Sequence, residues 1–356
     1  MGIAPQIQAF CIKGQPIHCE EFGNGHINQT LKIATDTGKS YILQRINHYV
    51  FKEPAKVMKN IFAVTNYLLE KTGDPTAALR FVSTRDGQFC HRDEDGNYWR
   101  MYEFVDGFCL EAAETAEDFY ESGVAFGQFQ QQLLDFPAHT LHETIPNFHN
   151  TPDRFRQLKD SICVDVKGRA AEVRQEIEFA LAHEDIGGTL QRMLEKGQLP
   201  LRVTHNDTKL NNVLLNPKTR KPLCVLDLDT VMPGLSAHDF GDSIRFGAAT
   251  AAEDEQDVSR MKLNLDYYEA YAKGFLEAAT ALTEAEIDAL PYGALIMTLE
   301  VGIRFLKDYL DGDVYFKTAY PTHNLVRCRT QFALVADMET KWAQMCSIIR
   351  RLKELS

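Results

Sequence analysis

The chain has 356 residues, of which 44% are hydrophobic and 25% are charged, and this composition excludes a largely disordered protein. Its net charge of −12 argues against nucleic acid or an anionic membrane as the main partner, because both are bound through clustered Lys and Arg. The eight cysteines show no C-x-x-C pair or zinc-finger spacing, so we expect reduced thiols and a cytoplasmic location. Glu300, Arg304 and Asp308 interrupt the most apolar stretch, 285–310, which argues against a membrane span.

The first hundred residues predict strands and one helix. A hairpin with a glycine-containing tip is expected over 17–33, and an apolar strand follows at 41–46. Residues 54–71 predict a helix, because a proline starts the segment and apolar residues recur at helical spacing. Two more strands are expected near 88–92 and 97–105.

After residue 106 the chain is mostly helical by its period. The expected helices are 117–135, 152–162, 169–195, 258–279, 283–311 and 323–352, with short β segments at 201–204 and 223–228. This pattern predicts an α+β fold of two lobes. A small antiparallel sheet with one helix would form residues 1–104, and a larger, mostly helical lobe would form residues 105–356. A ligand cleft is expected between two such lobes.

The strongest local signal surrounds Asp207, which has Lys209 two residues after it and Asn212 five after it. Twenty residues beyond Asp207, an apolar strand-like segment ends at Asp227. Phosphoryl transfer needs a carboxylate that accepts the proton of the attacking hydroxyl, oxygen ligands for Mg²⁺, and a cation that offsets developing charge. Asp207, then Asp227 with Asn212, and then Lys209 fill these roles in order. His205, two residues before Asp207, is predicted to fix the loop by hydrogen bonds. The alternative, a merely polar loop, does not account for this spacing.

Asp239-Phe240-Gly241 spells the D-F-G motif of protein kinases, but it follows no strand-like segment and lies 32 residues after Asp207. Asp227 has the spacing that a metal ligand needs. We therefore interpret Asp239 as a structural carboxylate, such as the cap of a helix that starts near Ser243.

The set from His205 to Asn212, followed by Leu226-Asp227, resembles the aminoglycoside phosphotransferase and choline kinase group, which shares the protein-kinase fold. Longer segments resemble the N-acetylhexosamine 1-kinases, and the likeness extends over roughly residues 20–335. The segments are 23–28, 41–44, 202–212, 240–247, 304–306, 311–316 and 320–327. The resemblance implies that ATP phosphorylates the anomeric hydroxyl of N-acetylglucosamine or N-acetylgalactosamine, with ATP and Mg²⁺ as cofactors.

By position, the resemblance makes Asp207 the catalytic carboxylate and Asp227 the metal ligand, and it places His26, Arg304 and Tyr315 around the sugar. Each of these three has a structural alternative. His26 could cap the hairpin tip, Tyr315 could be an aromatic plug, and Arg304 could join a helical row of ion pairs with Glu300 and Asp308. Asp229 could contact the sugar, a water beside it, or only solvent.

The nucleotide site departs from the protein-kinase pattern. Gln44 stands where the strand lysine would be, and the following helix lacks the partner glutamate, so both halves of that ion pair are missing. We expect Gln44 to contact phosphate through its amide, or Arg45 to do so instead. Gly23 and Gly25 would let backbone N–H groups approach the phosphates.

Backbone groups of the hinge between Glu103 and Val105 are predicted to bind adenine. Two rivals to the sugar 1-kinase remain open. One is a kinase of the same fold for choline, homoserine or an aminoglycoside, and an aromatic cage for choline could come from Tyr309, Tyr315, Phe316 and Tyr320. The other is a nucleotide-binding protein without activity. The sequence leaves the oligomeric state and the hexosamine preference open, and residues 136–200 carry no recognisable chemistry.

Overall fold

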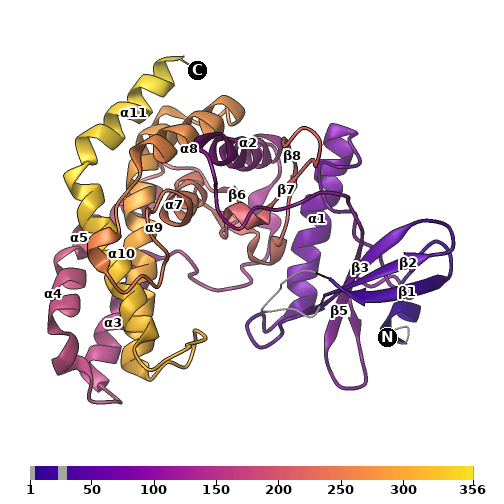
Figure 1. Ribbon diagram of the computed structural model, residues 1–356, viewed down its shortest axis with the longest axis horizontal. Coiled ribbons are helices and arrows are strands. Elements are labelled where there is room, and N and C mark those ends of the chain that lie inside the picture. The colour runs from indigo at the N-terminus through magenta and orange to yellow at the C-terminus, as the bar shows by residue number, and fades with distance from the viewer. Residues whose placement is uncertain (1–4, 23–29, 356) are drawn as a thin grey trace. The chain divides into compact units, whose positions relative to one another are not determined.

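The computed structural model describes residues 5–22 and 30–355, which fall into two compact units. Unit 1 comprises the chain up to Cys109 together with 132–146 and 212–233, and unit 2 comprises 110–131, 147–211 and 234–356. The chain therefore returns to unit 1 twice after first leaving it, whereas the sequence predicted one boundary, between residues 104 and 105. Figure 1 traces these segments by colour along the chain.

Unit 1 contains a five-stranded antiparallel sheet, which confirms the predicted N-terminal strands (Figure 1). Its strand order is β1-β2-β3-β5-β4. The strands are β1 (Pro16–Glu21), β2 (Thr30–Thr35), β3 (Ser40–Ile46), β4 (His91–Arg92) and β5 (Tyr98–Glu103). The predicted hairpin over 17–33 corresponds to β1 and β2, which pair antiparallel from Pro16 and Thr35 to Glu21 and Leu31.

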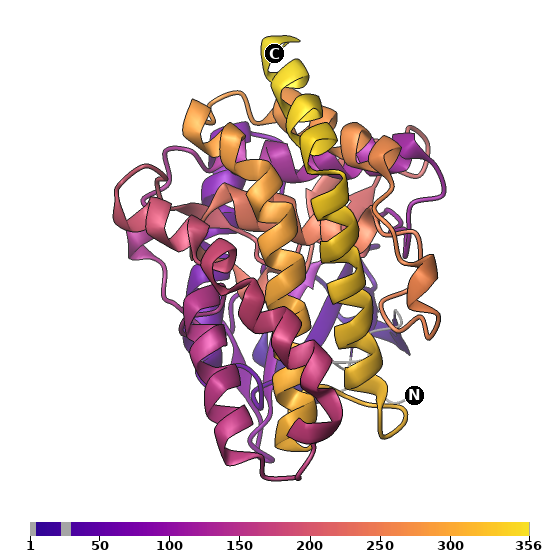
Figure 2. The same ribbon diagram turned by 90° about the vertical axis from the view of Figure 1, so that its left-hand side faces the viewer.

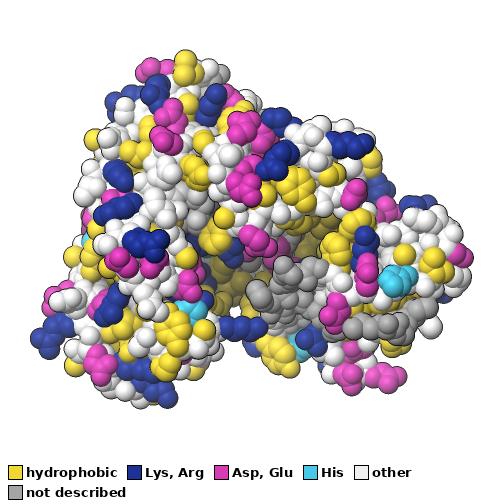
Figure 3. Space-filling view, in the orientation of Figure 1, with side chains coloured by type: hydrophobic (Ala, Val, Ile, Leu, Met, Phe, Trp, Pro, Cys, Tyr) yellow, Lys and Arg dark blue, Asp and Glu magenta, His cyan; other side chains and the backbone are white. Residues whose placement is uncertain are grey.

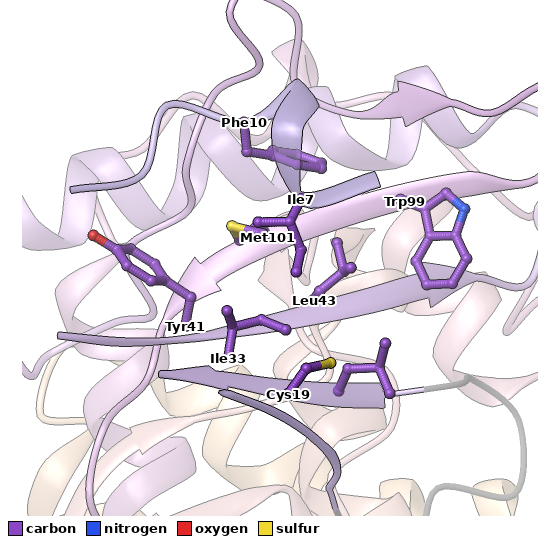
Figure 4. Packing of buried hydrophobic residues seen from close by; sticks show 9 residues of the cluster. Ile7, Phe10, Cys19, Ile33, Tyr41, Leu43, Trp99 and Met101 are labelled. Carbon is purple, nitrogen blue, oxygen red and sulfur yellow. The ribbon is translucent and has the colours of Figure 1, made fainter. Parts of the chain in front are cut away.

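Alternation along the strands gives this sheet one apolar face (Figure 4). The 3₁₀ helix η1 (Pro5–Ala9) contributes to the same core. The buried cluster comprises Ile7, Phe10, Cys19, Leu31, Ile33, Tyr41, Leu43, Trp99 and Met101. The opposite face therefore carries the residues between them, including Gln44 and Arg100, which are paired across β3 and β5.

Helix α1 (Pro54–Thr72) confirms the predicted helix, with Pro54 in its first turn and Gly73 closing it in the left-handed conformation. Unit 1 also contains the strands β7 (Val213–Leu215) and β8 (Pro222–Val225), which pair as a hairpin, and β9 (Met232–Gly234) begins in it. The short 3₁₀ helix η5 (Leu228–Thr230) follows β8 and packs against α1.

Unit 2 is helical, as predicted, and is built around α9 (Glu284–Asp311). Helices α3, α7, α10 and α11 pack against α9, and Figure 2 shows α9 and α10 side by side. Besides α9, the α-helices of this unit and its strand have the following bounds: α2 (Ala116–Gln132), α3 (Thr151–Val164), α4 (Arg174–Ala182), α5 (Glu184–Gly187), α6 (Thr189–Glu195), β6 (Arg202–Thr204), α7 (Ser236–Gly247), α8 (Leu265–Ala278), α10 (His323–Thr340) and α11 (Trp342–Leu355).

Four helical predictions were wrong in detail. The helix predicted over 258–279 begins only at Leu265, because the separate 3₁₀ turn η6 (Val258–Arg260) precedes it. Segment 169–195 is not one helix but the 3₁₀ turn η3 (Ala170–Val173) followed by α4, α5 and α6. Segment 323–352 is two helices that meet at Lys341. The helix expected to start near Ser243 begins seven residues earlier, as α7 at Ser236, because its first turns carry buried polar residues such as His238 and Asp239 that are typical of a loop in the sequence.

By length and composition α9 could cross a membrane, but 89% of its most apolar window is buried inside the protein. Thr283 and Glu286 form a capping box at its start, and Glu300 is fully buried within it. These are features of the central helix of a folded domain. On the face shown in Figure 3, acidic and basic side chains are interspersed over the helices of unit 2.

Candidate active site

The loop after β6 carries Asp207, and a carboxylate from α7 holds its backbone. Asp239 accepts the N–H groups of His205 at 2.9 Å and Asn206 at 2.8 Å, and it also accepts the side-chain amide of Gln130 at 2.7 Å. The Thr208 hydroxyl donates to the backbone carbonyl of Asp239 at 2.6 Å. Burial raises the pKa of Asp239, although these donors act in the opposite direction.

This geometry confirms that Asp239 is a structural carboxylate but corrects where its helix begins. Helix α7 starts at Ser236, not near Ser243, so Asp239 lies in its first turn and binds the loop instead of capping a later helix. Ser243 lies further along α7, and its hydroxyl donates to the Thr208 carbonyl at 2.7 Å.

A second carboxylate of α7, Asp242, accepts the backbone N–H of Thr208 at 3.0 Å and is paired with Arg245 at 2.9 Å. Burial would raise the pKa of Asp242, but the positive charges of Arg245 and Lys209 outweigh it and the net pKa is lowered. The loop is therefore fixed on both sides of Asp207 by two buried acids, Asp239, which the sequence analysis had interpreted as structural, and Asp242, to which it had given no role. Their helical spacing of three residues was the available signal.

Asp207 and Lys209 lie together at the accessible edge of this loop. Lys209 Nζ is 2.8 Å from Asp207 Oδ1, and the two side chains are 35% and 28% exposed. Burial would lower the pKa of Lys209, but the carboxylates of Asp207 and Asp242 outweigh it and the net pKa is raised. His205 is fully buried, its Nδ1 accepts the Asp207 N–H at 3.3 Å, and its ring packs edge-on against Phe126. His205 therefore has the structural role that was predicted, and Lys209 remains a cation beside the Asp207 carboxylate.

In unit 1, the two predicted metal ligands are carried by backbone segments that hydrogen-bond to each other. Leu226 N–H donates to the Asn212 carbonyl at 2.7 Å, and Asp227 follows in the left-handed conformation with φ 53° and ψ 59°. An amide oxygen and a carboxylate suit Mg²⁺, which uses one or two protein carboxylates and takes its remaining ligands from phosphates and water. The donor set of Asn212 and Asp227 therefore fits this ion. Within residues 5–22 and 30–355, no larger group of His, Cys, Asp and Glu is arranged for a metal.

Arg100, which the sequence analysis missed, connects Gln44 to Asp229. Its guanidinium binds both oxygens of Asp229, with Nη2 at 3.1 Å from Oδ2, and its Nε donates to Gln44 Oε1 at 2.8 Å. Gln44 Nε2 in turn donates to the Thr30 hydroxyl at 3.2 Å. Burial would lower the pKa of Arg100, but the Asp229 carboxylate outweighs it and the net pKa is raised. The signal was an arginine on β5 directly opposite the glutamine that replaces the kinase lysine.

These contacts bear on three predicted roles. One N–H of the Gln44 amide remains for a phosphate, because the other N–H and the oxygen are already bonded. Arg45 is exposed and belongs to the opposite face of the strand, which argues against it as the substitute. Asp229 is buried, so the alternative in which it meets only solvent is wrong, and its partner in the structure is Arg100.

The backbone N–H groups of the predicted hinge differ in whether they are already bonded. Glu103 N–H donates to the Arg80 carbonyl at 2.9 Å and Phe104 N–H to the Ser40 carbonyl at 2.9 Å, whereas Val105 N–H has no partner among the described residues. Val105 also packs on an apolar cluster of unit 1. The cluster comprises Leu79, Phe81, Tyr102, Leu214, Leu223, Cys224 and Leu226. Of the two predicted hinge contacts, Val105 therefore offers the free donor.

Arg304 forms no ion pair with either neighbour on α9, so the helical ion-pair alternative is wrong. The Glu300 carboxylate contacts His149 Nδ1 at 2.9 Å and the Thr151 hydroxyl at 2.7 Å, and Asp308 is bound to other groups. Burial would raise the pKa of Glu300, but the His149 hydrogen bond and nearby positive charges lower it to about 2. The Arg304 guanidinium instead lies 5.3–5.9 Å from the ring centres of Phe148, Tyr315 and Phe316.

Asp308 holds the loop that presents Tyr315. Its Oδ1 accepts the N–H groups of Val314 at 3.0 Å and Tyr315 at 2.8 Å, and its Oδ2 accepts Phe316 N–H at 3.0 Å and the Asn324 side chain at 2.8 Å. Tyr315 is 59% exposed, so it is not a buried aromatic plug. The structure thus places Arg304 beside Tyr315. His26, Gly23 and Gly25 lie outside the described residues.

The chain matches a known protein family and resembles several solved structures. The model of APH, the phosphotransferase enzyme family, matches residues 18–275. In fold the chain is similar to an aminoglycoside phosphotransferase from Alicyclobacillus acidocaldarius, with a TM-score of 0.62, 16% identity, and coverage of 99% of this chain and 98% of that one. A microcompartment-associated aminopropanol kinase has a TM-score of 0.63 at 16% identity, covering 92% and 93% of the two chains. An amicoumacin kinase in complex with AMP-PNP, Ca²⁺ and Ami has a TM-score of 0.56 at 15% identity, covering 90% and 89%.

Proposed function

This chain belongs to the APH phosphotransferase enzyme family, and from that premise we propose that it is an ATP- and Mg²⁺-dependent kinase of N-acetylhexosamines. The product would be the sugar 1-phosphate of N-acetylglucosamine or N-acetylgalactosamine, together with ADP. The family and the kinases of similar fold support a phosphotransferase with an alcohol acceptor. The sugar acceptor rests on the resemblance of the sequence segments and on the surroundings of Arg304.

In the proposed reaction, Asp207 accepts the proton of the anomeric hydroxyl while the oxygen attacks the γ-phosphorus of ATP, and ADP leaves. Lys209, 2.8 Å from Asp207, keeps this carboxylate oriented and offsets negative charge on the transferred group. Asn212 and Asp227 would hold Mg²⁺, which when bound neutralises charge on the phosphate oxygens. The free N–H of Val105 would bind the base, and the neighbouring apolar cluster would pack against it.

The observation that carries the acceptor proposal is the guanidinium of Arg304, which lies over three aromatic rings and pairs with no carboxylate in the part of the chain that the structure describes. A guanidinium without a carboxylate partner is a donor for a neutral oxygen acceptor, such as the carbonyl of an N-acetyl group or a sugar hydroxyl. Tyr315 beside it offers an exposed ring and hydroxyl, as carbohydrate-binding surfaces do. Both residues are those that the sequence resemblance placed around the sugar.

The same observation disfavours choline and other cationic acceptors. The aromatic residues that could have formed a cage already have partners, because Arg304 lies over Tyr315 and Phe316, Arg169 lies 4.4 Å from the centre of Tyr309, and Tyr320 stacks on His323 at 4.6 Å. A quaternary ammonium would have to displace a guanidinium and would be repelled by it.

An acceptor panel tests the proposal directly. The protein is incubated with Mg-ATP and N-acetylglucosamine, N-acetylgalactosamine, galactose, choline, homoserine or kanamycin, and ADP release is followed. We expect turnover with the two N-acetylated sugars, and phosphorus NMR should place the phosphate on the anomeric oxygen. Turnover of an amine but of no sugar would overturn the acceptor assignment. If no compound in the panel causes ADP release, the result favours the alternative of a nucleotide-binding protein without activity.

A further inference from the structure

The buried pair of Arg100 and Asp229 needs an explanation beyond stability. Their side chains are 3% and 6% exposed, and the guanidinium binds both carboxylate oxygens. Buried ion pairs often add little net stability over apolar residues of similar volume, because desolvation opposes the attraction. They do impose one geometry, since an arginine–carboxylate fork is directional.

This pair is part of a chain of side chains that runs across unit 1. Thr30 on β2 accepts from Gln44 on β3, Gln44 accepts from Arg100 on β5, and Arg100 binds Asp229 in η5. The sheet is rigidly packed on its other face by the core of Figure 4. These contacts therefore fix the position of η5 relative to the strands β2, β3 and β5.

Asp229 lies two residues after Asp227, whose backbone is in the left-handed conformation with φ 53°. A non-glycine residue keeps this conformation only where its surroundings enforce it. The surroundings hold the segment at several points: Leu226 N–H bonds to the Asn212 carbonyl at 2.7 Å before it, and Asn60 of α1 donates to the Val231 carbonyl at 3.0 Å after it. The Arg100 fork acts between these two restraints.

We propose that Arg100 is a positioning residue for the metal-binding carboxylate: by clamping Asp229 to the sheet, it sets the direction in which Asp227 presents its oxygens. The cation that orders this nucleotide site is then Arg100 on β5, where protein kinases use a lysine on β3. Arg100 acts on the turn that carries Asp227 and does not contact phosphate. Because the proposed function makes Asp227 a metal ligand, this role of Arg100 depends on that function.

The test is Mg²⁺-dependent binding of AMP-PNP, measured by titration calorimetry without any acceptor. The variants are Arg100→Lys, Asp229→Asn and the double variant Arg100→Met/Asp229→Leu. The double variant replaces both charges with apolar side chains, so we expect it to fold with an unfolding midpoint near that of the wild type. Its affinity for AMP-PNP without Mg²⁺ should be unchanged, whereas the Mg²⁺ concentration needed for tight binding should rise about 10–100-fold.

Arg100→Lys keeps the charge but not the fork, so we expect an intermediate Mg²⁺ requirement. The matched control is Arg329→Met/Glu176→Leu, which removes an ion pair of 2.6 Å between α10 and α4 in unit 2 and should titrate as the wild type does.

The outcomes separate the possibilities. A double variant with the wild-type Mg²⁺ requirement overturns the role of Arg100 while the proposed function stands. A raised KM for the sugar in Asp229→Asn, with an unchanged Mg²⁺ titration, also overturns it and makes Asp229 a sugar contact. If the wild type itself binds AMP-PNP without any Mg²⁺ dependence, the proposed function fails and the role of Arg100 fails with it.

Discussion

Asp239 accepts the backbone N–H of Asn206 at 2.8 Å, although the two residues are 33 positions apart in the sequence. Asn206 directly precedes Asp207 and has a φ of 63°, in the left-handed region that few residues besides glycine, asparagine and aspartate adopt. A carboxylate in the first turn of α7 therefore stabilises the bend that precedes Asp207. Under the proposed function, this link makes the helix a support of the catalytic loop without any contact to a substrate.

Replacing Asp239 should damage stability and activity together. Asp239→Ala leaves the N–H groups of His205 and Asn206 without an acceptor, and each buried donor of this kind costs about 1–3 kcal/mol. Asp239→Asn keeps one oxygen and should lose less. Urea unfolding and kcat measure the two effects. An unfolding free energy for Asp239→Ala within about 0.5 kcal/mol of the wild type would contradict this account.

Asp207→Asn should separate chemistry from folding. The side chain lies at the accessible edge of its loop, so the amide should leave the unfolding midpoint nearly unchanged. As a proton acceptor is worth about 10²–10⁴ in rate, kcat should fall by about that factor while nucleotide affinity is retained. ADP release and AMP-PNP binding measure these quantities. A near-normal kcat would remove Asp207 from the role of base.

The lowered pKa of Glu300 predicts that the free energy of unfolding decreases at acid pH. Burial would raise its pKa, but the His149 hydrogen bond and the nearby positive charges together lower it from 4.5 to about 2. A carboxyl with a lowered folded-state pKa contributes stability that is fully present above about pH 4.5 and is lost as the pH falls through about 2. The difference in unfolding free energy between the wild type and Glu300→Gln should therefore narrow over this range. Urea unfolding at a series of pH values tests this, and a constant difference would contradict it.

Much of the fold could be predicted because its signals are local. The hairpin of β1 and β2 and the helix α1 are marked by turn glycines, a starting proline and regular apolar spacing. The Asp207 loop could be proposed as a site because its candidate residues lie within nine consecutive positions. Sequence periodicity missed the start of α7, because polar residues such as His238, Asp239 and Asp242 are buried there and do not form an exposed face.

The remaining site residues act through partners that are distant in the sequence. Arg100 and Asp229 are 129 positions apart, and nothing in either segment alone identifies the other as its partner. Arg304 shows the opposite error: its local spacing to Glu300 and Asp308 indicated ion pairs, but both acids are bound by groups from other segments or from the following loop. Tertiary contacts thus replace the ion pairs expected along the helix, each of which would contribute only about 0.2–0.5 kcal/mol.

Arg304 should be needed for the acceptor and not for the nucleotide. A hydrogen bond from a charged donor is worth about 1.5–3 kcal/mol, so Arg304→Met should lower kcat/KM for the sugar by about 10–100-fold at an unchanged KM for ATP. Lys307→Met on the same helix is the matched control, because Lys307 is paired with Asp311 at 2.5 Å. Steady-state kinetics with each substrate varied decides the point. Equal losses in the two variants would show that Arg304 has no special role.

Asp308 should affect the binding of the sugar, because it anchors the loop that carries Tyr315. Asp308→Ala removes the acceptor of three consecutive N–H groups, from Val314 to Phe316, so the loop that carries Tyr315 loses its fixed position. We expect a higher KM for the sugar, an unchanged KM for ATP, and faster hydrogen exchange of these three amides. Asp311→Ala at the end of the same helix is the control, since Asp311 is paired with Lys307 and should leave the loop amides protected. Because exchange reports the loop directly, unchanged protection in Asp308→Ala would contradict the anchoring role even if the KM rose.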